Sequence, residues 1–122
     1  AALEAVAFQT RDLLEAMRGD GAAPTSLRVD GGMTANDWTM QALANLLGMR
    51  VERPTNLEST AVGAAMLAGL QVGLFNDLDG LAARWTRDSQ FDPAISTADA
   101  KARYRLWRMA VARTRSNAVA ID

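Results

Sequence analysis

The stretch Leu27-Arg28-Val29-Asp30-Gly31-Gly32-Met33-Thr34-Ala35-Asn36 predicts a β-strand that leads through a glycine turn directly into a helix. Its first three residues form a short run typical of a strand, which Asp30 and the paired glycines end. Thr34 is followed three residues later by Asp37, which is the spacing of a capping box. A helix is therefore predicted from about Ala35.

The residues that follow this stretch predict a β-α-β unit. The helix should end at Gly48, because glycine readily takes the left-handed conformation after a helix. Residues 50–53 then predict a second strand, ended by Pro54. Such units have parallel strands and a right-handed crossover. The predicted fold class is α/β, helix-rich with a small, mostly parallel sheet, and because two strands make a poor sheet we expect further strands in a longer polypeptide.

Three further helical patterns flank this unit. Apolar residues recur at three- and four-residue spacing over residues 3–17 and stop near Gly19. Residues 58–75 predict a buried helix rich in small residues. A final helix should follow Ser96 and Asp99, a second capping pattern.

The segment before this last helix is less regular, since Phe91 and Pro93 indicate only a short extended or looped piece. No repeat or linker divides the chain, so residues 1–122 are treated as one domain or part of one. Ala1 lies inside a helical pattern, and we therefore expect a piece of a longer polypeptide.

Composition excludes several classes of function. The formal net charge is -1 and the pI about 5.4, which argues against electrostatic binding to nucleic acid or an anionic membrane. Cysteine and histidine are absent, so disulfides, zinc sites and iron–sulfur sites are excluded and no metal ligand is predicted. The most apolar stretch, residues 61–75, is shorter than the roughly 20 residues of a bilayer span.

The glycine turn is the candidate ligand site. Gly31 and Gly32 let a ligand approach the backbone closely, and the amides at a helix start attract anions. Asn36, about one turn into the helix, offers a donor and an acceptor suited to an adenine edge. An ordinary tight turn with a solvated asparagine explains the same residues. Asp30 either helps place Mg²⁺ or, as we prefer, braces the turn.

The small residues of one helix and the cations of the final helix each have a functional and a purely structural explanation. The small residues from Ala61 to Gly69 favour close packing over a ligand surface. Cationic side chains in the final helix suit its negative end better than a binding patch; they are Lys101, Arg103, Arg105, Arg108, Arg113 and Arg115. Neither Gly-x-Gly-x-x-Gly nor the Walker pattern occurs, which disfavours ordinary Rossmann and P-loop domains.

The motifs resemble, in order and spacing, the glycerol kinases of the FGGY carbohydrate kinase family. The resemblance covers nearly the whole chain, with its main motifs at residues 29–36, Val51-Glu52-Arg53-Pro54, Thr60-Ala61-Val62-Gly63-Ala64-Ala65 and Leu67-Ala68-Gly69-Leu70, and further matches at residues 8–12, Tyr104 and Trp107. It implies part of a ribonuclease-H-like domain of the actin and hexokinase-like ATPase superfamily. This would be the C-terminal nucleotide-binding domain.

The resemblance also implies a reaction and a role for this chain in it. The whole enzyme would transfer the γ-phosphate of ATP to glycerol, giving glycerol 3-phosphate and ADP, with Mg²⁺ held largely by other parts. Gly32 and Asn36 would contact the nucleotide, with Gly31 close by. No catalytic residue is assigned here, because the glycerol-binding residues, general base and first phosphate loop have no counterpart. The chain alone should be inactive, and the enzyme a cytoplasmic homo-oligomer.

Three alternatives remain open at this point. Another FGGY kinase, for xylulose or gluconate, shares the Gly-Gly and Gly-Ala-Ala elements, although residues 51–54 favour glycerol kinase. A non-catalytic ATP-switch module of the same superfamily is a second. A folded remnant that associates through an exposed sheet edge is a third.

Overall fold

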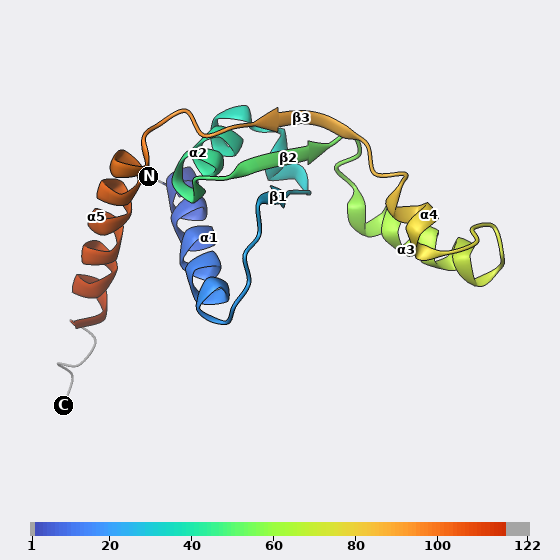
Figure 1. Cartoon of the computed structure of the whole chain (residues 1–122), viewed down its shortest axis with the longest axis horizontal. Coiled ribbons are helices and arrows are strands. Elements are labelled where there is room, and N and C mark those ends of the chain that lie inside the picture. The colour runs from blue at the N-terminus through green and yellow to red at the C-terminus, as the bar shows by residue number, and fades with distance from the viewer. Residues whose placement is uncertain (1, 117–122) are drawn as a thin grey trace.

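The structure, a computed structural model, describes residues 2–116. Along the chain it contains α1 (Ala2–Gly19), β1 (Ser26–Arg28), the 3₁₀ turn η1 (Gly32–Ala35), α2 (Asp37–Leu47), β2 (Arg50–Pro54), α3 (Ser59–Gln71), α4 (Leu78–Ala82), β3 (Arg87–Phe91) and α5 (Thr97–Ser116). Figure 1 shows α1 and α2 beside the sheet, with α5 at one end and α3 and α4 at the other. No helix in the described range is both long and apolar enough to cross a bilayer.

The sheet contains the predicted β-α-β unit and one strand more. β1 pairs with β2 in parallel, with Leu27 opposite Val51. β3 adds to the other side of β2 in the antiparallel direction, with Val51 opposite Phe91. The helix-rich α/β prediction is thus confirmed, but the sheet is mixed. β3 was predicted only as an extended or looped piece, because its sequence Arg-Asp-Ser-Gln-Phe lacks the apolar alternation of a half-buried strand.

The core lies where α1, α2 and the sheet meet. Val51, the second residue of β2, is fully buried, and Phe91 of β3 packs against the same cluster. The predicted end of α2 is confirmed, since Gly48 has φ 64° and its amide donates to the carbonyl of Ala44. The other buried members come from α1, α2 and the turn after α2: Ala7, Leu14, Met40, Leu43, Ala44, Leu46, Leu47 and Met49.

An aromatic and polar clasp joins α5 to α1. The rings of Phe8 and Trp107 stack with centroids 5.2 Å apart. Tyr104 Oη and Trp107 Nε1 donate to the two carboxylate oxygens of Asp12 at 2.5 and 2.8 Å. Burial, and then this hydrogen bond to Asp12, raises the pKa of Tyr104 to about 12. The clasp fixes the middle of the last helix relative to the first.

The predicted cap of α5 is confirmed. Ser96 Oγ accepts from the amide of Asp99 at 3.1 Å and donates to its carboxylate at 2.7 Å. Both partners of the capping pattern thus stabilise the first turn of α5.

The prediction of a buried helix over residues 58–75 is wrong for this chain. α3 ends at Gln71, and Gly69 is its only buried residue. The Leu67 side chain is 59% exposed. The helix is apolar on most of its surface, which is typical of a helix covered on several sides, but α3 lies with α4 away from the α1–α2 core (Figure 1). Within the described chain little packs on it.

Candidate nucleotide-binding turn

The turn after β1 has a positive-φ geometry that requires glycine. Gly31 has φ 88° and ψ 164°, a conformation that residues with a Cβ rarely adopt. Its amide donates to the carbonyl of Leu57 at 3.2 Å, and its carbonyl accepts from Thr34. The chain therefore reverses at Gly31 and enters η1 directly.

The helix starts two residues later than predicted, and with a different cap. Thr34 was expected to cap a helix from about Ala35, but it lies inside η1, where its hydroxyl donates to the carbonyl of Gly31 at 2.6 Å. Such back-bonding removes the hydroxyl from a capping role. Asn36 caps α2 instead, with φ -88° and ψ 104°, and its Oδ1 accepts from the amide of Thr39 at 3.0 Å.

This cap leaves one polar group of Asn36 for a ligand. The acceptor of a hydrogen bond from an N–H must be Oδ1, so the Nδ2 amino group is the part not used by the cap. The side chain is exposed, and among residues 2–116 Nδ2 has no hydrogen-bond partner. Asn36 can therefore hold the helix start and donate to a ligand at the same time.

Gly32, the first residue of η1, presents open backbone. A Cβ added to Gly32 would meet no atom within 4 Å, so internal packing does not require glycine there. The amides of Gly32 and Met33 open η1 and have no partner within the helix. Gly31, Gly32 and Asn36 all lie on the short segment between β1 and α2.

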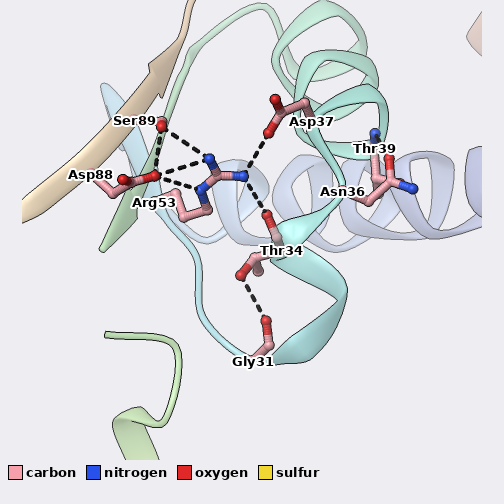
Figure 2. A network of polar contacts seen from close by, with 8 residues as sticks. All are labelled: Gly31, Thr34, Asn36, Asp37, Thr39, Arg53, Asp88 and Ser89. Atoms are coloured by element: carbon pink, nitrogen blue, oxygen red, sulfur yellow. Dashed lines mark hydrogen bonds and ion pairs between the residues drawn. The ribbon is translucent and has the colours of Figure 1, made fainter. Parts of the chain in front are cut away.

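Arg53 also belongs to this region. The sequence placed it only in the second strand and in the motif at residues 51–54, and indicated no function for it. Its Nη1 donates to the carbonyl of Thr34 at 3.0 Å and to Asp37 Oδ1 at 2.7 Å. Its Nε donates to Asp88 Oδ2 at 3.0 Å and its Nη2 to Ser89 Oγ at 3.0 Å. Figure 2 shows the guanidinium bridging β3 and the η1–α2 junction. The sequence did contain one sign of this contact: an arginine inside a strand, and an aspartate at the start of the helix before it.

The charges of this cluster stabilise each other. The hydrogen bonds that Arg53 donates to Asp37 and Asp88 raise its pKa above the ordinary value. The pKa of Asp88 is lowered, first by the hydrogen bond from Ser89 and then by the one from Arg53. Arg53 is therefore held as a cation and Asp88 as a carboxylate throughout the neutral range.

The other candidates have ordinary surroundings. Asp30 is exposed, and among the described residues no three acidic side chains gather as a metal site. Val62, Gly63 and Met66 of α3 line a cavity of about 360 Å³ together with Arg28 and Trp85. The final-helix cations noted above are exposed, as helix-surface charges are.

Comparison with known proteins shows that this chain is similar to carbohydrate kinases. A sequence model of the FGGY family of carbohydrate kinases, C-terminal domain, matches residues 1–72. The glycerol kinase of Ectopseudomonas mendocina (strain ymp) is 55% identical over 117 residues, which are 95% of this chain and 24% of that protein. The glycerol kinase of Rhodospirillum centenum is 54% identical over 118 residues, 97% of this chain and 24% of its own.

Solved structures agree with these sequence matches. Plasmodium falciparum glycerol kinase with ADP matches with a TM-score of 0.76 and 33% identity, over 92% of this chain and 23% of that one. Xylulose kinase from Rhodospirillum rubrum matches with a TM-score of 0.70 and 28% identity, over 93% and 23%. The predicted fold class, part of an actin and hexokinase-like ATPase domain, is confirmed. The chain spans about a quarter of the length of the relatives it matches.

Proposed function

Because the chain belongs to the FGGY family of carbohydrate kinases, we propose that it is part of an ATP-dependent glycerol kinase. The full-length enzyme would transfer the γ-phosphate of ATP to glycerol, giving glycerol 3-phosphate and ADP. The observation that carries this proposal is the identity of 54–55% to curated glycerol kinases along nearly the whole chain.

Within that enzyme, we propose that this chain supplies one side of the nucleotide site. Gly32 would offer open backbone to the ligand, Asn36 would donate through Nδ2, and Gly31 would hold the turn that places both. The match to a glycerol kinase solved with ADP supports a nucleotide as the ligand. Residues 1–122 would then form one part of the C-terminal nucleotide-binding domain.

The rest of the reaction would depend on other parts of the polypeptide. Mg²⁺ would neutralise charge on the ATP phosphates and would be held largely by other parts of the polypeptide, together with the phosphates themselves. We therefore assign to this chain no metal ligand, general base or glycerol contact.

Two further properties of the full-length protein are part of the proposal. A kinase that consumes ATP requires an ATP pool, which supports a cytoplasmic location. Large exposed apolar side chains on and near α3, such as Val72 and Leu74, support further subunit or domain contacts and are consistent with a homo-oligomer.

Other sugar kinases share the fold, so substrate choice needs a direct test. We expect the full-length polypeptide to form ADP from ATP when glycerol is added, and to form much less with xylulose or gluconate. Preference for xylulose or gluconate would leave the family assignment unchanged and would change the assigned substrate. No turnover with any of the three would contradict the kinase proposal and favour an ATP-switch module.

A further inference from the structure

We propose that Arg53 is a positioning residue for the nucleotide-binding turn, acting on the ligand through Asn36. This inference rests on the proposed function of that turn. Arg53 lies on β2, a central strand whose two neighbours in the sheet are fixed by backbone pairing. The turn that it would position lies between η1 and α2.

The contacts of Nη1 enclose Asn36 on both sides along the chain. One is the carbonyl of Thr34, two residues before Asn36, at 3.0 Å. The other is the carboxylate of Asp37, the residue directly after Asn36, at 2.7 Å. A single guanidinium nitrogen thus connects the last turn of η1 to the first residue of α2. The backbone of Asn36 lies between two tethered points.

The other half of the guanidinium is anchored on β3. Nε donates to Asp88 at 3.0 Å, and Nη2 lies 2.9 Å from the same carboxylate oxygen and 3.0 Å from Ser89 Oγ. Ser89 in turn donates to Asp88 at 2.6 Å. The planar guanidinium is therefore held from two sides, and it transmits the position of the sheet to the turn.

These contacts favour positioning over direct ligand binding. All three nitrogens of Arg53 have protein partners, and only 14% of the side chain is exposed. A cation beside a helix N-terminus is also opposed by the helix dipole. Asp37 and Asp88 offset that repulsion, so the arrangement is stable because of its partners. In Figure 2 Asn36 and Arg53 lie on opposite sides of the η1–α2 junction, and no bond is drawn to Asn36 Nδ2.

A ligand-binding turn gains affinity when its donors are held in place before the ligand arrives. Without Arg53, Thr34 and Asp37 lose their shared tether, and Asn36 can sample more orientations. The binding of ATP or ADP should weaken, while glycerol contacts elsewhere in the enzyme should not change.

The test uses the full-length polypeptide and compares Arg53→Gln with wild type. We expect the Kd for ADP and the KM for ATP to rise about tenfold, with the KM for glycerol unchanged. The decisive readout is a double-mutant cycle with Asn36→Ser, a variant that removes the amide donor and keeps a capping oxygen. If Arg53 acts through Asn36, the Arg53→Gln effect should largely disappear in the Asn36→Ser background.

Two control variants separate positioning from charge and from general stability. Arg53→Lys keeps the cation, but its single nitrogen cannot bridge the Thr34 carbonyl and Asp88 together, so the Kd should stay raised even where the thermal midpoint recovers. Arg87→Gln breaks the 2.8 Å ion pair with Glu52 on the same pair of strands and should leave the Kd unchanged.

The possible failures are distinguishable. Full recovery of affinity in Arg53→Lys would mean that Arg53 acts by charge alone, and an undiminished effect in the Asn36→Ser background would mean that it does not act through Asn36. Either result overturns the inference. If Asn36→Ser weakens nucleotide binding and Arg53→Gln does not, the inference fails and the proposed function stands. If Asn36→Ser has no effect on nucleotide binding, the inference fails with it, and if Gly32→Ala has no effect either, the proposed nucleotide site itself fails.

Discussion

Asn36 combines a structural and a proposed binding role through its two polar atoms. Oδ1 accepts from the amide of Thr39 and so caps α2, while Nδ2 has no partner among the described residues. A substitution to alanine would remove both roles together and would confuse loss of a cap with loss of a ligand contact. The residue therefore has to be tested with a variant that keeps the cap.

Asn36→Ser is that variant. Serine caps helices about as well as asparagine, so we expect little change in the thermal midpoint, whereas the loss of the amide donor should weaken ATP binding about tenfold. Asn36→Ala should add about 1 kcal/mol of destabilisation. Calorimetric titration with ADP and thermal unfolding of the full-length polypeptide measure the two effects separately.

Gly32→Ala is the second variant to measure in the same experiment. An added Cβ meets no atom within 4 Å in the free chain, so stability should change little, and weaker nucleotide binding would report a ligand close to that backbone. Wild-type affinity in both Gly32→Ala and Asn36→Ser would contradict the assignment of the turn.

At the scale of the elements, polar contacts reinforce the pairing of β2 with β3. Arg53 binds Asp88 and Ser89 across the two strands, and Arg87 pairs with Glu52 at 2.8 Å. β3 has few apolar residues of its own: Phe91 packs against the core, and the backbone ladder and these ion pairs hold the rest of the strand to β2. This also explains why β3 was not recognised as a strand from its sequence.

This pairing predicts a pH dependence with a definite sign. The folded-state pKa of Asp88 lies below the ordinary 3.8 of an aspartate, so its carboxylate stabilises the fold above that pH. The contribution should be lost as the pH falls below about 3.8 and through the folded-state pKa. In urea unfolding of the full-length polypeptide, wild type should exceed Asp88→Asn in midpoint at neutral pH, and the gap should close in acid. A gap independent of pH would contradict the role of the carboxylate.

At the scale of the molecule, the described chain has one compact half and one open half. α1, α2 and the sheet share a core, and α5 is joined to α1 through Phe8, Asp12, Tyr104 and Trp107. α3 and α4 extend from this core with large apolar side chains exposed. Leu74, just after α3, is 75% exposed. The proposed enzyme needs catalytic and glycerol-binding groups that no motif of this chain supplies.

We therefore expect the 122-residue chain by itself to form no ADP from ATP and glycerol, under conditions in which the full-length polypeptide turns over. The measurement is a coupled ADP assay with both proteins at equal concentration. Glycerol-dependent turnover by the chain alone would show that its own residues include the catalytic groups. It would contradict the proposal that those groups lie in other parts of the polypeptide.

The sequence by itself determined the local features that depend on neighbouring residues. The β-α-β unit, the left-handed Gly48, the Ser96–Asp99 cap and the glycine turn all follow from short-range backbone preferences, and the motif order pointed to the right family. Their backbone conformations are set by neighbouring residues, although the pairing of β1 with β2 and the bond from the Gly31 amide to Leu57 join distant segments.

The tertiary structure decided what depends on contacts between distant segments. Residue 36 rather than 34 caps α2, because the Thr34 hydroxyl turns back to Gly31 and its carbonyl is held by Arg53. β3 became a strand because β2 offered an unpaired edge, and α3 is exposed because little of this chain packs on it. Periodicity gives the apolar surface of a segment, but only the folded chain shows which partner is present to cover it.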